Sequence, residues 1–231
     1  MRERIYTIPV NKAFENSSDG CPFCLLFDEL ENTDLDLILG ASMMESDIRN
    51  LTNKQGFCPK HFSKMFFQKN RLGLALMLES HLNQLKGELK TGGIFSKNPA
   101  SGPIKRIEKL NKSCYVCEQI EEKITKMFST AVYLYETEKE FVRKFNSQKM
   151  FCLPHYKILL ETAYRNLDKD KFKSFVKDAE KIMADYLERL GEDVSWFCKK
   201  FDYRYNDQPW KNSKDSVERS IRFLSGPLDL E

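Results

Sequence analysis

A set of three cysteines and one histidine occurs twice along the sequence, and it constrains the fold more than any other feature. In each copy a Cys-x-x-Cys motif is followed by a Cys-x-x-His motif, with 33 residues between the two motifs in the first copy and 34 in the second. Two complete sets at near-equal spacing indicate an internal duplication. The eight residues are Cys21, Cys24, Cys58, His61, Cys114, Cys117, Cys152 and His155.

Each set offers ligands that Zn²⁺ prefers, and we expect two zinc ions per chain. Zinc binds four thiolate or imidazole donors in a tetrahedron at about 2.0–2.3 Å. A Cys-x-x-Cys turn places two sulfur atoms on one side of the ion, and a Cys-x-x-His motif at a helix start adds a sulfur and an imidazole. Because four protein ligands leave no open coordination position, we expect both sites to be structural.

Other uses of these residues stay open. The cysteines could be buried free thiols, could form disulfides, or could hold an iron–sulfur cluster with one histidine ligand. For zinc we expect each ion to be bound within one copy of the motif pair, because a crossed arrangement would close longer loops.

Composition and hydrophobic periodicity predict an all-α fold in which two duplicated helical zinc-binding units pack as a helical bundle. Glycine and proline number only 10 and 8, which argues against a turn-rich β-sandwich. We expect four segments: a first unit over 1–93, a linker over 94–113, a second unit over 114–191, and a C-terminal loop and short helix over 192–231.

Three local signals refine the expected helices. The apolar pattern of the first unit is interrupted at Asn32–Asp34 and at Gly40, which predicts two shorter helices there rather than one. Gly191 is expected to end the last helix of the second unit. Each Cys-x-x-His motif contains a proline, Pro59 or Pro154, which is tolerated in the first turn of a helix.

Charge and hydropathy narrow the class of partner. The formal net charge is +3, from 37 basic and 34 acidic residues, which gives no electrostatic argument for a nucleic-acid groove or an anionic membrane. No apolar stretch approaches the roughly 20 residues that a spanning helix needs, and the N-terminus lacks the apolar core of a signal peptide. We therefore expect no membrane partner and a cytoplasmic location, where cysteines are more often metal ligands than disulfides.

The C-terminal segment mixes aromatic and charged residues. Such side chains in a loop could bind a ligand or a partner, or could dock the tail onto the helices by hydrogen bonds and cation–π contacts. The candidate ligand or partner site consists of Asp202, Arg204, Trp210, Lys214, Asp215 and Arg219.

Together these motifs resemble an uncharacterised family of bacterial proteins, a domain of unknown function. Besides the doubled cysteine and histidine motifs, the resemblance rests on an Asn-Arg-Leu-Gly helix start at 70–73 and a tail with Phe-Asp-Tyr-Arg at 201–204 and Lys-Asp at 214–215. It covers the chain from about Ile5 to Gly226. The resemblance implies the architecture but no activity, substrate or catalytic residue.

The first functional hypothesis is a zinc-stabilised module that binds a protein or a small ligand without catalysis. The sequence has no Gly-rich phosphate loop, no His-Glu-x-x-His and no Gly-x-Ser-x-Gly motif. The alternative is a redox or metal-sensing protein that uses the Cys-x-x-Cys thiols or an iron–sulfur cluster. A third hypothesis, nucleic-acid binding, rests on lysines between 97 and 126 and is opposed by the near-neutral total charge.

Overall fold

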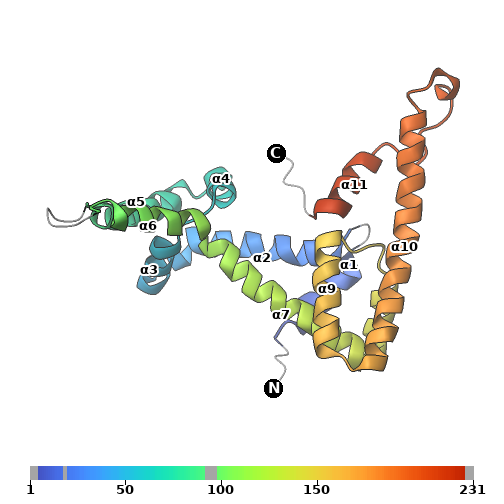
Figure 1. The fold of residues 1–231 in the computed structure, drawn as a ribbon, viewed down its shortest axis with the longest axis horizontal. Coiled ribbons are helices and arrows are strands. Elements are labelled where there is room, and N and C mark those ends of the chain that lie inside the picture. Colours follow the sequence, from blue (N-terminus) through green and yellow to red (C-terminus); the bar gives the residue numbers. More distant parts are fainter. Residues whose placement is uncertain (1–4, 18–19, 92–97, 227–231) are drawn as a thin grey trace. The chain divides into compact units, whose positions relative to one another are not determined.

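The described part of the chain folds entirely into helices. A computed structural model describes residues 5–17, 20–91 and 98–226, and these contain eleven α-helices and two 3-10 helices with no strand (Figure 1). The all-α fold expected from composition and periodicity is confirmed. Within these residues, no helix combines the length and the apolar character that crossing a membrane requires.

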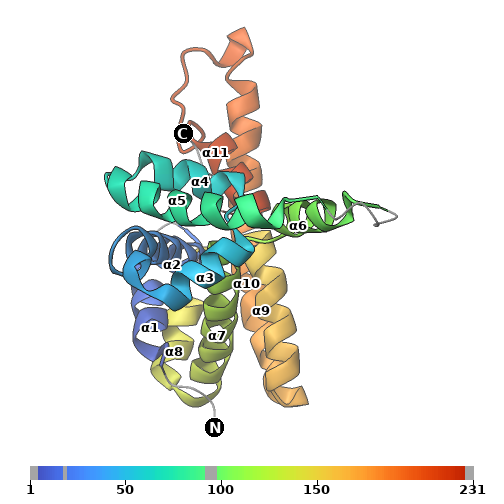
Figure 2. The same ribbon diagram turned by 90° about the vertical axis from the view of Figure 1, so that its left-hand side faces the viewer.

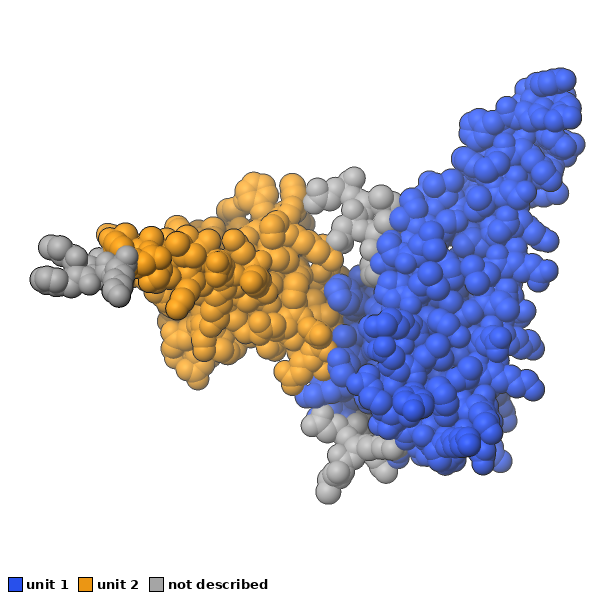
Figure 3. Space-filling model, in the orientation of Figure 1, with its two compact units in different colours: residues 1–28, 124–231 blue, residues 29–123 orange. Residues whose placement is uncertain are grey.

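The helices form two compact units that differ from the two halves of the sequence duplication. One unit comprises 1–28 and 124–231, and the other comprises 29–123 (Figure 3). The boundaries fall inside α2 (Pro22–Leu39) and α7 (Tyr115–Thr137), so each of these helices begins in one unit and ends in the other. Each unit therefore combines segments from both copies of the repeated motifs.

The unit of 29–123 is built around α5 (Arg71–Glu88), which packs against α3, α4 and α6. Figure 2 shows α4 and α5 side by side. The bounds of its other elements are η1 Ala41–Met44, α3 Ser46–Gln55, α4 Pro59–Phe67 and α6 Ser101–Lys112. Helix α6 occupies most of the segment that we expected to be a linker, so the described part of 94–113 is mainly helical; residues 94–97 lie outside the described residues.

The unit of 1–28 and 124–231 is built around α10 (Lys169–Lys199), which packs against α8, α9 and α11. The bounds of its other elements are α1 Thr7–Asn16, α8 Lys139–Asn146, α9 Leu153–Asn166, η2 Tyr203–Tyr205 and α11 Ser216–Ser225. The expectation that a helix ends at Gly191 is wrong, because α10 continues to Lys199. A Cβ at Gly191 would meet no atom within 4 Å, so this glycine costs the helix only about 1 kcal/mol of propensity.

Phenylalanine rings fill the core of this unit. Phe23 and Phe128 stack with their ring centroids 3.8 Å apart, and Phe14 contacts Phe23 edge to face at 5.6 Å. Aromatic pairs contribute about 0.5–1.5 kcal/mol each beyond the burial of their area. The buried phenylalanines are Phe14, Phe23, Phe128, Phe141, Phe145, Phe151, Phe175 and Phe223.

All four cysteine motifs lie at helix N-termini. Cys58 is the N-cap of α4 and Cys152 is the N-cap of α9, and each of these helices has a proline in its first turn. Cys21 directly precedes α2, and Cys114 directly precedes α7. The unpaired N–H groups and the positive end of the helix dipole favour thiolate over thiol at such positions.

Candidate metal centres

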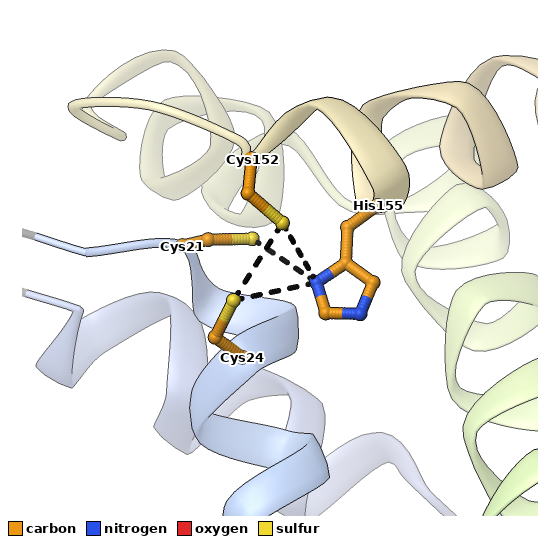
Figure 4. Close-up of side chains that lie close together, drawn as sticks. All are labelled: Cys21, Cys24, Cys152 and His155. Carbon is orange, nitrogen blue, oxygen red and sulfur yellow. Dashed lines mark hydrogen bonds between the residues drawn. The ribbon is translucent and has the colours of Figure 1, made fainter. Parts of the chain in front are cut away.

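The eight cysteine and histidine residues form two groups of four, one in each unit. Site 1 consists of Cys21, Cys24, Cys152 and His155, and site 2 consists of Cys58, His61, Cys114 and Cys117. Within each group the four potential ligand atoms all lie within 4.8 Å of one another. Figure 4 shows site 1, in which the side chains of Cys21 and Cys24 from the start of α2 point toward Cys152 and His155 from the start of α9.

The expectation that each site forms within one copy of the motifs is wrong, because the structure pairs the motifs crosswise. The expected interruption at Asn32–Asp34 does not occur, and α2 continues for 18 residues to Leu39. This helix carries the chain from the unit that contains Cys21 and Cys24 into the unit that contains Cys58. Helix α7, with 23 residues, carries it from the unit of Cys117 back to the unit of Cys152.

Loop length does not prevent the crossed pairing. Cys24 and His155 are 131 positions apart, whereas Cys24 and His61 are much closer along the chain. Because closure entropy grows only with the logarithm of loop length, the longer loop costs about 1 kcal/mol more. Binding of a structural zinc ion supplies of order 10 kcal/mol, so helix packing decides which motifs meet.

Four of the distances between donor atoms of site 1 are close to the edges of a tetrahedron around one ion. His155 Nδ1 lies 3.6 Å from Cys21 Sγ, 3.5 Å from Cys24 Sγ and 3.2 Å from Cys152 Sγ. The sulfur atoms of Cys24 and Cys152 are 3.6 Å apart. Tetrahedral zinc with ordinary bond lengths separates two sulfur ligands by about 3.8 Å, and a sulfur from a nitrogen by about 3.6 Å.

The donor atoms of site 2 also lie close together, and its histidine is slightly nearer to the sulfurs than that of site 1. His61 Nδ1 lies 3.2 Å from Cys58 Sγ, 3.1 Å from Cys114 Sγ and 3.4 Å from Cys117 Sγ. The sulfur atoms of Cys58 and Cys117 are 3.9 Å apart. Both histidines therefore present Nδ1 to the site, which leaves Nε2 of each ring for another contact.

The surroundings of site 1 are apolar. The rings of Phe23 and Phe128 lie 6.1 and 5.7 Å from the ring of His155, between centroids. Both phenylalanines are fully buried, and Cys21 and Cys152 are 2% and 0% exposed. Burial raises the pKa of the Cys21 thiol to about 12, because a thiolate loses solvation in the apolar core.

The surroundings of site 2 are charged. Nε2 of His61 lies 3.0 Å from Oε1 of Glu31, whose side chain is 2% exposed and also contacts Lys60 and Lys64. Burial alone would raise the pKa of Glu31. Hydrogen bonds from His61 and Lys64 and the charge of Lys60 outweigh this effect and lower the pKa to about 2. Glu31 is thus an ionised acceptor that holds the Nε2–H of His61 and orients Nδ1 toward the cysteines.

Sequence reasoning missed Glu31. No local motif marks it, because it is one of 34 acidic residues and lies 30 positions from His61. Ligating histidines commonly donate their second N–H to a carboxylate, but only the fold identifies the carboxylate that lies beside His61.

A search of known families identifies the chain. A family model described as a family of unknown function (DUF6062) matches residues 1–231. The chain belongs to this family. No curated protein and no solved structure matches it. The family resemblance drawn from the motifs is confirmed, and DUF6062 membership brings no activity with it.

The C-terminal residues of this DUF6062 chain do not form one site. Asp202 and Arg204 form an ion pair at 2.6 Å with each other, and Trp210 packs on Phe197 and Phe201 with centroids 5.7 and 6.5 Å away. Lys214 is exposed. These contacts fit docking of the tail onto α10.

Two of the expected residues line a cavity instead. Arg219 binds Asp193 at 2.9 Å and Asp215 at 3.0 Å. Arg219 and Asp215 lie, with Lys149 and Arg189, in the wall of a cavity of about 500 Å³ beside α10.

Lys200 organises the C-terminal loop and was also missed. Its side chain is 6% exposed, and Nζ donates hydrogen bonds to the carbonyl oxygens of Tyr205, Asn206 and Gln208 at 2.6, 2.9 and 2.6 Å. Nothing in the sequence distinguishes this lysine from Lys199 beside it.

Proposed function

We propose that this chain is a zinc-stabilised helical module with two structural zinc ions, and that it binds a protein or a small ligand without catalysis. The observation that carries the proposal is the spacing of donor atoms in sites 1 and 2. In each site three sulfurs and one imidazole nitrogen would fill all four positions around one ion, so no position would remain for a reacting water.

The spacing favours a single ion over the iron–sulfur alternative. A cluster places two or four iron atoms and their bridging sulfides between its protein ligands, so ligands on different irons lie further apart than those of one ion, whereas all four donor atoms of each site lie within 4.8 Å of one another. The sulfur-to-sulfur distances of 3.6 Å in site 1 and 3.9 Å in site 2 match the edge of a one-ion tetrahedron. Three thiolates and one imidazole are a common ligand set of structural zinc.

The location of the sites supports a structural role. Each ion would join the starts of two helices that are far apart in the sequence: α2 with α9 in site 1, and α4 with α7 in site 2. Apparent free energies of order 10 kcal/mol for structural zinc compare with 5–15 kcal/mol for the stability of a whole domain. Reduced cysteines persist in the cytoplasm, which is where we place the protein.

The cavity beside α10 supports the binding part of the proposal. Its volume of about 500 Å³ is in the range of small-molecule sites. We do not extend the proposal to nucleic acid, because Arg106, in the basic segment that suggested it, donates its hydrogen bonds to the carbonyl oxygens of Lys54 and Asn53 at 2.7 and 2.6 Å.

Metal analysis of protein purified without added metal tests the proposal. We expect two zinc ions per chain, and we expect a chelator strong enough to remove them to reduce helicity measured by circular dichroism. A coloured protein that contains iron and sulfide would favour the redox alternative. Two zinc ions that can be removed without any loss of helicity or thermal stability would contradict the structural role.

A further inference from the structure

The two metal sites differ in how far their cysteines are shielded from solvent. In site 1, Cys21 and Cys152 are buried and Cys24 is half-buried, and phenylalanine rings lie against the ligating histidine. In site 2, Cys117 is exposed and Cys58 is half-buried. A competing ligand can therefore reach the Cys117 sulfur of site 2 from solvent, whereas in site 1 only Cys24 is partly accessible and the other two cysteines are covered by the core.

The ligands of site 2 also differ among themselves in how firmly they are held. His61 is 1% exposed, and its second nitrogen lies 3.0 Å from the buried carboxylate of Glu31. Cys114 is 5% exposed. Cys117, in the first turn of α7, is the ligand of site 2 that lies in solvent. Cys117 is thus the most exposed of the three cysteines of site 2, and its bond to a metal can be replaced without moving a buried side chain.

The charges around site 2 favour an anionic replacement. Three thiolates and a zinc ion leave a net charge of −1, and Glu31 adds another negative charge. Lys60, 3.2 Å from Oε1 of Glu31, and Lys64, which contacts Oε2, compensate both. An incoming thiolate therefore meets less repulsion than it would at an uncompensated site with three cysteines and one histidine.

We propose that site 2 exchanges its metal with external thiols through Cys117, while site 1 keeps its ion as a permanent part of the core. This inference rests on the proposed function, because it needs both sites to hold zinc. The ligand class is a small thiol or a cysteine of a metal-donating or metal-accepting protein. Site 2 then serves as the point at which zinc enters and leaves the chain.

The exchange step is a ligand substitution without redox chemistry. The incoming thiol forms a bond from its sulfur to the metal, and the bond from the metal to Cys117 breaks. The proton of the thiol passes to the Cys117 sulfur, which leaves as a neutral thiol. Cys58, Cys114 and His61 would hold the ion together with the new sulfur, so the ion would have four ligands before and after the step and its oxidation state would not change.

Transfer of zinc to a coloured chelator tests this proposal. The protein is first shown to contain two zinc ions, and 4-(2-pyridylazo)resorcinol is then added with increasing glutathione. We expect one ion per chain to leave at a rate that rises with glutathione. The second ion should leave about tenfold more slowly or slower still, at a rate that does not depend on glutathione.

Two matched variants show which site releases its zinc in the fast, glutathione-dependent phase and which in the slow phase. Cys117→Ser should remove the glutathione-dependent phase and leave one slow zinc ion, whereas Cys24→Ser, at the equivalent position of site 1, should retain the glutathione-dependent phase. Mapping by mass spectrometry after brief treatment of the two-zinc protein with N-ethylmaleimide should find Cys117 modified well before Cys21, with the exposed Cys198 as the reference for a cysteine outside both sites.

Three results would overturn the inference: a single rate for both ions, a fast phase that survives in Cys117→Ser, or equal protection of Cys117 and Cys21. Each requires that two zinc ions were present at the start. Protein that contains no zinc would instead contradict the proposed function, so the two failures can be told apart.

Discussion

The sulfur atoms of Cys24 and Cys152 lie 3.6 Å apart although the residues are separated by 128 positions. This contact joins the first Cys-x-x-Cys motif to the second Cys-x-x-His motif, and it makes the crossed pairing testable by counting metal. A serine in place of one cysteine weakens one site, so two serines abolish either one site or both, depending on which cysteines share an ion.

We therefore expect Cys21→Ser/Cys152→Ser to retain about one zinc ion per chain, because both changes fall in site 1. Cys21→Ser/Cys58→Ser should retain close to none, since it disables both sites. Elemental analysis after gel filtration measures the content, and circular dichroism shows whether each variant is still helical. If Cys21→Ser/Cys152→Ser instead retained no zinc and Cys21→Ser/Cys58→Ser retained one ion, each ion would be bound within one copy of the motifs.

The eight cysteine and histidine residues that gather in the two groups stood out in the sequence, but their pairing was not predictable. Cysteine and histidine are rare in this chain, with 7 and 3 residues, so their spacing stands out. The pairing depends on whether α2 is interrupted at Asn32–Asp34. In the structure Thr33 Oγ1 donates to the carbonyl oxygen of Glu29, 2.7 Å away, and Asp34 forms an ion pair with Lys123. The ion pair of Asp34 with Lys123 joins residues that are far apart in the sequence, so local helix propensity cannot predict it.

The same limit applies to the residues that support the sites. Glu31 supports His61, and Lys200 supports the C-terminal loop, because the fold buries each of them beside its hydrogen-bond partners. Glutamate and lysine are common on any protein surface, so their residue types alone do not mark them. The Asn70–Gly73 motif is intermediate. Its pattern is visible in the sequence, and the fold supplies the reason, because Asn70 Oδ1 accepts from the backbone N–H of Gly73 at 2.9 Å and Asn70 Nδ2 donates to the Leu39 carbonyl oxygen at 2.5 Å.

Gly73 permits this close approach between the start of α5 and the end of α2. A Cβ at position 73 would overlap the carbonyl oxygen of Leu39 and crowd the amide of Asn70. Because the nearest obstacle is backbone, Gly73→Ala should lower the free energy of unfolding by about 1–3 kcal/mol. Urea titration followed by circular dichroism, with zinc present, measures the change.

Gly87 provides the control in the same helix. A Cβ there would meet no atom within 4 Å, so Gly87→Ala should leave stability unchanged or raise it by up to about 1 kcal/mol. If both variants lose the same stability, the approach to Leu39 is not what requires glycine at position 73.

Lys200 holds the loop of 201–210 through three carbonyl oxygens, and its Nζ also lies 5.4 Å from the centroid of the Trp210 ring. Hydrogen bonds to a charged group contribute about 1.5–3 kcal/mol. We expect Lys200→Met to loosen the loop more than it affects the helices. Chymotrypsin should then cleave faster after the exposed Phe201 and Tyr203, and tryptophan emission should shift to the red.

Lys199→Met tests the specificity of that effect, because Lys199 is adjacent and exposed. It should leave both the cleavage rate and the emission at the values of the unchanged protein. Equal cleavage of the two variants would show that the three hydrogen bonds of Lys200 do not order the loop.

His81 should give the stability of the protein a pH dependence. Burial lowers the pKa of His81 below its ordinary value of 6.5, and the charge of Arg106 lowers it further, against smaller opposing effects of Glu88 and the backbone of Asn53. Above pH 6.5 the residue is neutral in the folded and unfolded states alike. As the pH falls below 6.5, the unfolded chain takes up a proton that the folded chain resists, so the free energy of unfolding decreases.

We expect His81→Gln to make the stability less sensitive to pH between about 6.5 and 5, the window that opens below the pKa of the unfolded chain. One proton accounts for at most about 1.4 kcal/mol per pH unit, and partial exposure of the ring reduces this. Urea titrations of both proteins with excess zinc at several pH values measure the difference between their free energies of unfolding. Release of zinc in acid affects both proteins alike, so it largely cancels in this difference. If the pKa of His81 is depressed in the folded state, the unchanged protein must lose stability faster than the variant as the pH falls. Parallel plots of the free energy of unfolding against pH would therefore show that His81 titrates alike in the folded and unfolded states.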